Sequence, residues 1–228
     1  MRDFVVDSWR FYKANILGLL PLVLPLWVVV QTLTSYWVMS IELPDGAGVT
    51  QPIPLELYYK PLGLSLLITP VISAVVILKF TADRMGQSVN AATLYLQAIL
   101  AWPKMFITTL VTHFMIVIGF MAFIFPGFFA LARLAYAPFL VVLENRMPWV
   151  AIGESWSGSE PLMKELMFGH IKLVLLALVP YFVVSQAIVP HIQGSLVGVV
   201  ALNIVMNLVM LIFTAFRFRC YWHWRYEN

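Results

Sequence analysis

The sequence predicts an all-α membrane protein, a bundle of six transmembrane helices formed by a single domain over residues 1–228. Apolar residues make up 61% of the chain and charged residues 11%, against roughly 45–50% and about 25% in a soluble domain. The apolar residues also gather in stretches that reach the roughly 20 residues needed to cross a hydrocarbon core of about 30 Å. A water-soluble fold is excluded, because a core of this size could not cover so much apolar surface.

Six stretches have the length and composition of a membrane span. They cover residues 16–41, 61–80, 105–125, 127–143, 171–190 and 195–216. The first is longer than the apolar region of a signal peptide, roughly 7–15 residues, so we expect it to remain as an anchor. Pro126 and Gly127 predict a tight hairpin between the third and fourth spans, with a single re-entrant element as the alternative. Pro138 predicts a kink or a local adjustment within the short fourth span.

The distribution of Lys and Arg predicts the orientation of the spans. Of the fourteen Lys and Arg residues, twelve lie on one side of the predicted bundle, Lys60 lies on the other, and Arg133 lies within a span. Because positively charged segments remain in the cytoplasm, we expect both termini on the cytoplasmic side. The outer loop, residues 42–60, contains several Pro and Gly residues and is predicted to be irregular and exposed.

Three segments on the cytoplasmic side share one plan, in which a short helix of mixed polarity runs straight into an outgoing span. These segments begin at Asp7, Ser88 and Trp149. The plan predicts three pseudo-repeats, roughly 1–80, 81–143 and 144–219, each an in-plane amphipathic helix followed by a two-span hairpin. Because few residue identities support the alignment, a chance similarity of pattern is the alternative.

Four stretches have the order and character of a known family: SWRFYKANILGLL, AILAWPKMFITTL, FPGFFALARLAYAPFLVVLENRMPWVAIGESW and LIFTAFRFRCYWHW. The third is the most specific, and its pattern is carried by Pro126, Gly127, Ala137, Pro138 and Glu144. In these stretches the chain resembles the YciC-like inner-membrane proteins of Gram-negative bacteria. The resemblance implies a multi-pass protein of the bacterial inner membrane with a role in envelope homeostasis. It implies no activity and no functional residues, and Arg133 departs from the apolar residue expected there.

Enzyme signatures are absent from the sequence, which has no Walker loop, no His-Glu-x-x-His, no cysteine pair and no dinucleotide-binding glycine pattern. We therefore predict that the protein is not an enzyme and has no catalytic residue, cofactor or bound metal. The segment around Ser155 lacks the closing glycine of a nucleophile elbow. The Lys and Arg residues are scattered between apolar stretches, which argues against nucleic-acid binding.

Polar residues inside the predicted spans are the candidate functional residues, because a charge in hydrocarbon costs several kcal/mol unless it is paired or hydrated. They are Arg133, Gln186, Asn203, Asn207 and His113. A rise of about 1.5 Å per residue places Arg133, Gln186 and Asn203 in the outer half, and His113 with Asn207 near the middle. Asn203 and Asn207 share a helix face, which is predicted to point into the bundle. Together the five residues would line a polar cavity between spans four and six.

Structural roles are the alternative for these residues. Arg133 would then extend to the outer headgroups, the amides would hydrogen-bond to neighbouring helices, and His113 would be satisfied by Thr109 or Thr112. The small residues Gly194 and Gly198 favour close approach of another helix, from this chain or from a second copy.

Two functions fit the sequence. The first is a non-enzymatic accessory in envelope or lipid homeostasis that binds membrane lipids, through anionic headgroups at the cytoplasmic face, or binds a membrane protein or a second copy of itself. The alternative is a small transporter or channel with a polar cavity between spans four and six. A continuous polar path across the bilayer favours transport, whereas a dry core with lateral grooves favours lipid binding.

Overall fold

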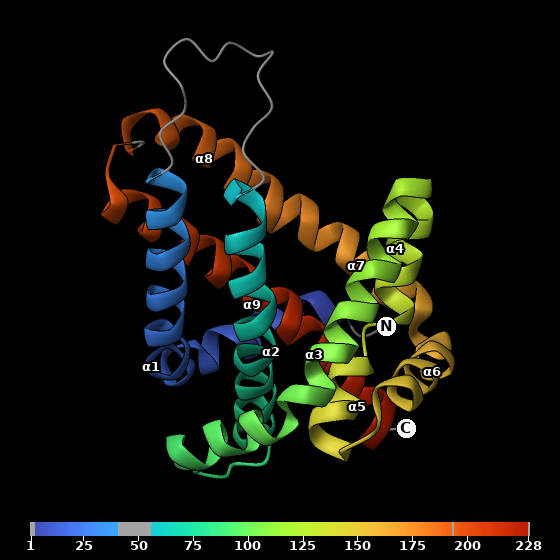
Figure 1. Ribbon diagram of the computed structural model, residues 1–228. Helices are drawn as coiled ribbons and strands as arrows, with labels where there is room; N and C mark the ends of the chain where they lie inside the picture. Colours follow the sequence, from blue (N-terminus) through green and yellow to red (C-terminus); the bar gives the residue numbers. More distant parts are fainter. Residues whose placement is uncertain (1–2, 41–55, 193, 228) are drawn as a thin grey trace.

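The computed structural model describes residues 3–40, 56–192 and 194–227, and its regular secondary structure there is helical (Figure 1). The elements are α1 (Phe4–Met39), α2 (Glu56–Arg84), α3 (Ala91–Ala122), α4 (Ile124–Arg133), α5 (Ala137–Glu144), α6 (Pro148–Gly158), the 3-10 turn η1 (Glu160–Leu162), α7 (Met163–Leu173), the π-helical turn η2 (Val174–Leu178), α8 (Val179–Ile192) and α9 (Leu196–Tyr226). The predicted all-α class is confirmed. Most of the predicted outer loop, residues 42–60, lies outside the described residues.

Within the described ranges, six helical segments are long and apolar enough to cross a membrane, and each covers most or all of one predicted span. They are Phe4–Met39, Tyr59–Arg84, Ala91–Ala122, Ile124–Glu144, Glu160–Ile192 and Leu196–Tyr226. The protein is therefore a multi-pass membrane protein.

One end of the molecule gathers both chain ends. The ring of Phe4 at the start of α1 lies 5.3 Å from that of His223 near the end of α9, and Arg84 at the end of α2 pairs with Glu227 at 3.0 Å. We call this end the basal half; it also contains α5, α6 and the first turns of α3 and occupies the lower part of Figure 1. The opposite, distal half contains the α3–α4 connection, α8 and the first turns of α9.

Two of the three predicted helix-to-span junctions are continuous helices. In Figure 1, α1 and α3 each change direction between a basal segment and a steeper segment. Pro21 and Pro25 lie inside α1, and Pro103 lies inside α3; each Pro removes a helical hydrogen bond and favours a bend.

The third junction is not continuous, which corrects the prediction for the segment beginning at Trp149. α6 ends at Gly158, and the short turn η1, which contains Pro161, separates it from α7. A side chain at Gly158 would begin only 2.2 Å from the ring of Trp224, so glycine allows α9 to pass close to the end of α6.

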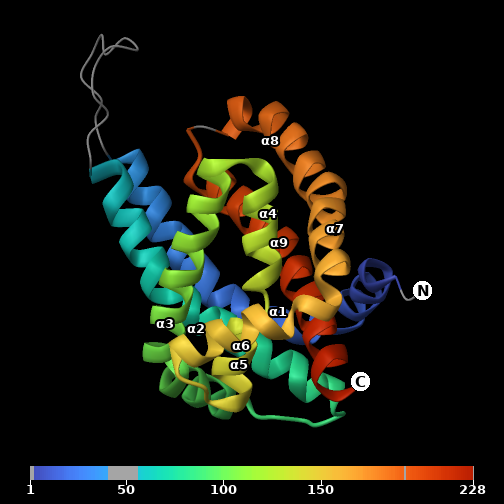
Figure 2. The same cartoon turned by 90° about the vertical axis from the view of Figure 1, so that its right-hand side faces the viewer.

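The third and fourth spans form a hairpin of two antiparallel helices (Figure 2), but its turn differs from the prediction. The chain turns at Phe123, which has an extended backbone, and Pro126 and Gly127 lie in the first turns of α4. A Cβ atom on Gly119 would lie 3.0 Å from Cα of Gly127. The two glycines therefore let α3 and α4 approach closely, and Pro126 is tolerated because the first turn of a helix needs no N–H donor there.

The buried core lies in the basal half. Its largest fully buried side chains include Tyr136, Phe139, Phe216, Phe218 and Tyr221. By contrast, Ser185 is the one buried residue of α8, and the buried residues of α9 all fall within 211–221. Helix packing is therefore dense at the basal end. At the distal end it is sparse around α8 and the start of α9, while the α3–α4 hairpin and the last turns of α1, which bury Val30 and Ser35, stay packed.

Candidate functional site

The fourth span is interrupted between α4 and α5, and a serine from α6 fills the interruption. The hydroxyl of Ser155 donates a hydrogen bond to the carbonyl of Arg133 at 2.8 Å and accepts one from the N–H of Tyr136 at 3.0 Å. Ser155 is fully buried. Its hydroxyl thus satisfies backbone groups that the helix break would leave unpaired, which is a structural role. The predicted local adjustment near Pro138 is this break, with Pro138 in the first turn of α5.

Arg133, the charged residue of the predicted cluster, is held beside α6 and η1. Its Nη1 donates to the carbonyl of Trp156 at 2.9 Å and lies 3.7 Å from a carboxylate oxygen of Glu160. The guanidinium also lies 5.2 Å from the ring centroid of Phe129, and its side chain is only 14% exposed. Arg133 therefore joins the fourth span to the last turn of α6, and the structure places it toward the basal half.

Arg133 is not brought to the amides of the sixth span. α4 packs against α3, α6 and α7. Because the turn at Phe123 comes earlier than predicted, the ten residues of α4 carry the chain about 15 Å from the turn to Arg133. This is deeper than the sequence suggested and explains why Arg133 meets α6 instead of the outer headgroups.

The other predicted polar residues differ in their surroundings. His113 is exposed, and its Nδ1 lies 2.7 Å from the carbonyl of Thr109, so the structural alternative for His113 fits, with the backbone of Thr109 as the partner. Gln186 is exposed on α8, and Asn203 is partly buried on α9.

Asn207 does line a cavity, but between other spans than predicted. The cavity lies between α1, α2 and α9, that is, between spans one, two and six, and has a volume of about 120 Å³. Its polar lining comes from Thr69, Ser73, Asn207 and Thr214, with Trp27 at one wall. The side-chain nitrogen of Asn207 is buried and has no hydrogen-bond partner.

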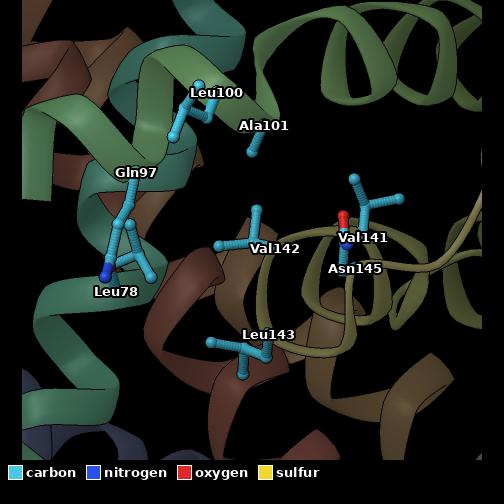
Figure 3. Close-up of a pocket in the computed structure, with 8 residues that line it drawn as sticks. All are labelled: Leu78, Gln97, Leu100, Ala101, Val141, Val142, Leu143 and Asn145. Atoms are coloured by element: carbon cyan, nitrogen blue, oxygen red, sulfur yellow. The ribbon is translucent and has the colours of Figure 1, made fainter.

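A larger groove of about 350 Å³, which the sequence did not reveal, opens between α2, α3 and α5 (Figure 3). Six apolar residues and two amides surround it: Leu78, Gln97, Leu100, Ala101, Val141, Val142, Leu143 and Asn145. Figure 3 shows Leu78 and Gln97 on one side and Val141 and Asn145 on the other, with Val142 between them. Volumes of roughly 300–1,000 Å³ are typical of ligand sites.

The polar rim of the groove is built on the end of α5. Asn145 adopts the left-handed conformation (φ 54°, ψ 28°) and donates its N–H to the carbonyl of Leu140, which caps the helix; Asn is one of the few residues that tolerate this conformation. Lys104 of α3 donates to the side-chain oxygen of Asn145 at 2.7 Å and to its carbonyl at 3.3 Å. A cation therefore stands at the rim with neutral acceptors around it.

Next to the groove, an ionic cluster joins α5, α6 and α9. Glu144 accepts hydrogen bonds from Tyr221 at 2.8 Å and from Arg225 at 2.5 Å. Arg146 lies 3.5 Å from Glu144 and 3.4 Å from Glu154, and Arg225 lies 3.4 Å from Glu154. The cluster is internally neutral, so it attaches the end of α9 to α5 and α6 and leaves Lys104 as the cation of the groove rim.

Two further predictions concern close helix contact and metals. A Cβ atom on Gly194 would meet no heavy atom within 4 Å, while one on Gly198 would meet Ile192 and Ser195 in the adjoining turn.

Across the described part of the chain, His, Cys, Asp and Glu side chains form no group of three or more that could hold a metal ion.

No family model, curated protein or solved structure matches this chain. The resemblance to YciC-like proteins therefore stays a prediction, and the structure identifies the chain as an all-α, multi-pass membrane protein.

Proposed function

We propose that this protein is a non-enzymatic membrane protein that binds an anionic phospholipid in the groove between α2, α3 and α5, as an accessory in lipid or envelope homeostasis. The observation that carries the proposal is the combination of an apolar groove with a cationic rim. Such a site matches the two parts of a lipid, an apolar chain and a charged headgroup.

The walls of the groove suit an acyl chain. Leu78 comes from α2, Leu100 and Ala101 from α3, and Val142 and Leu143 from α5. Because these aliphatic side chains offer no hydrogen bonds, they complement hydrocarbon and would leave a polar solute unsatisfied. The groove is not enclosed, so a chain could enter it without a change in the helices.

The rim suits an anionic headgroup. Lys104 forms no ion pair with a carboxylate of the described residues; its partners are oxygen atoms of Asn145. Its positive charge is therefore available to a phosphate, and the amide groups of Asn145 and Gln97 add hydrogen-bond donors. A Lys or Arg near an anionic membrane surface contributes about 1 kcal/mol of binding.

The rim of the groove lies in the basal half of the protein. We therefore also propose which side of the membrane the basal half faces. Twelve of the fourteen Lys and Arg residues belong to the side predicted to be cytoplasmic, which supports a basal face in the cytoplasm of a bacterium. Fusion of a periplasm-dependent enzyme or a cytoplasm-dependent fluorescent protein to Asn228 tests this: only the fluorescent fusion is expected to be active, and the reverse result contradicts the orientation.

The lipid proposal is tested by native mass spectrometry of the protein extracted in mild detergent, with the co-purifying lipids identified. Wild type is expected to retain an anionic phospholipid in preference to a zwitterionic one. Ala101→Leu, which fills the groove, is expected to lose the lipid, and Lys104→Gln is expected to lose the preference for anionic headgroups.

Matched controls lie outside the groove. Ala92→Leu changes an exposed alanine near the start of α3, and Lys164→Gln removes an exposed charge from α7; both are expected to retain the lipid as wild type does. Equal retention by Ala101→Leu and wild type contradicts the groove as the site, and a wild type that retains no lipid contradicts the proposal itself.

A further inference from the structure

A second cavity lies on the other side of α2 from the lipid groove, between α1, α2 and α9. The two sites share no lining residue. Asn207 lies about eleven residues, or roughly 16 Å, from the start of α9, which places the cavity near the middle of the span. Headgroups do not reach this depth, so the cavity calls for a different ligand from the groove.

The cavity presents hydrogen-bond donors. The side-chain nitrogen of Asn207 is buried and unpaired, and a buried donor without a partner is unfavourable unless a ligand or water accepts its hydrogen bond. The hydroxyls of Thr69, Ser73 and Thr214 line the same space. No carboxylate is among the residues that line the cavity, so the groups present favour a ligand that accepts hydrogen bonds.

A cation adjoins the basal end of the cavity. Arg217 donates from Nε to the carbonyl of Phe213 at 3.3 Å and from Nη2 to the hydroxyl of Thr214 at 3.5 Å. Both acceptors precede Arg217 on α9, so the guanidinium folds back toward the middle of the span instead of extending to the basal surface. Since Thr214 lines the cavity, the charge stands next to it.

Arg217 forms no ion pair with a carboxylate of the described residues. In the described residues, every ion pair between a side-chain cation and a carboxylate involves other groups. A cation held away from water is unfavourable unless an anion or solvent compensates it. The surroundings of Arg217 therefore favour the same kind of ligand as Asn207 does.

We propose that the cavity between α1, α2 and α9 binds a small inorganic anion such as chloride, held by Asn207, the lining hydroxyls and the charge of Arg217. A volume of about 120 Å³ is enough for a monatomic anion with water and smaller than the roughly 300–1,000 Å³ of sites for larger ligands. The proposal is independent of the lipid groove.

The test measures the Tm of the purified protein in detergent while chloride replaces gluconate at constant ionic strength. An anion that binds the folded state raises its Tm as the concentration increases. Wild type is expected to show this rise. Asn207→Leu and Arg217→Gln are each expected to bind chloride about tenfold more weakly or worse, because the first removes a donor that lines the cavity and the second removes the positive charge next to it.

The controls separate this site from general salt effects. Asn203→Leu removes an amide one turn away on the same helix, and Lys164→Gln removes an exposed charge; both are expected to keep the wild-type dependence. A Tm of wild type that is independent of chloride contradicts the proposal, as does an unchanged chloride dependence in both Asn207→Leu and Arg217→Gln.

A second experiment locates the anion directly in the wild-type protein, so the test does not depend on whether the variants fold. In crystals grown with bromide, the anomalous signal is expected at the cavity, within hydrogen-bonding distance of the side-chain nitrogen of Asn207. A cavity that contains water and no bromide overturns the assignment.

Discussion

The basal and distal halves of this protein are connected by the same long apolar helices but pack very differently. At the basal end, Tyr136 stacks on Trp224 at 5.1 Å and Phe139 on Tyr221 at 5.2 Å, beside an ionic cluster around Glu144. At the distal end, Met121 and Phe123 are about four-fifths exposed. The same apolar helices are therefore packed tightly at one end and largely exposed at the other.

The physical reason is that lipid removes the hydrophobic drive between helices, because acyl chains are as apolar as Leu and Val. Helices then associate where small residues, aromatic stacking or hydrogen bonds give specific contacts. The basal half has many of these groups, such as Ser155, Gly169 and Arg225, whereas the distal half relies on Gly119 and Gly127 of the α3–α4 hairpin. The distal turns of α3, α8 and α9 carry mostly aliphatic side chains, which interact with lipid as well as with one another.

The largest effect is expected from Ser155→Ala, which removes the hydroxyl at the break of the fourth span. The N–H of Tyr136 loses its partner, at a cost of about 1–3 kcal/mol, and the carbonyl of Arg133 keeps only the longer hydrogen bond from Ser159 at 3.4 Å. We expect a decrease of about 3 kcal/mol in the free energy of unfolding, measured by reversible unfolding in micelles.

Ser157→Ala is the matched control, because Ser157 is exposed on the same helix and bonds only to carbonyls of its own helix. Its effect is expected to stay within about 0.5 kcal/mol. Equal effects of the two substitutions would show that the break does not depend on α6.

A smaller effect is expected from Leu166→Ala, compared with Leu176→Ala ten residues further along the same span. Leu166 is fully buried and Leu176 is 71% exposed. We expect a loss of about 2 kcal/mol for Leu166, at the low end for a core leucine, because the loss comes from the cavity and not from transfer out of water. Leu176→Ala is expected to have almost no effect in the same unfolding assay; a comparable loss at Leu176 would show that the distal half is also tightly packed.

The smallest effect is expected from Glu144→Gln, which weakens the ionic cluster between α5, α6 and α9. The Glu144 side chain is 15% exposed and has three partners. We expect a loss of about 1 kcal/mol, together with faster hydrogen exchange in the last turns of α9. Glu160→Gln is the control, since Glu160 is 74% exposed, and a loss as large as that of Glu144→Gln would contradict the special role of the cluster.

Much of the fold was predictable from the sequence, and the candidate site was less so. The six spans follow from local composition, and the proline positions indicate the bends of α1 and α3. The place of Arg133 was not predictable, because it depends on a turn at Phe123 and on the last turn of α6, twenty-three residues away along the chain. Ser155 lies about twenty residues after the break between α4 and α5 that it fills. No pattern in the sequence links the two, so the role of Ser155 could not be predicted.

By itself, the sequence determined six segments long and apolar enough to cross a membrane, with most Lys and Arg residues on the side that it predicts to be cytoplasmic. Both properties arise from transfer of individual segments between water and lipid, so no contact between segments is needed to specify them. The tertiary structure alone decided which polar residues come together: Asn207 lines one cavity with Thr69 and Ser73, and Lys104 hydrogen-bonds to Asn145. Their meeting depends on helix rotation and crossing, which packing between distant segments sets and local hydropathy does not encode.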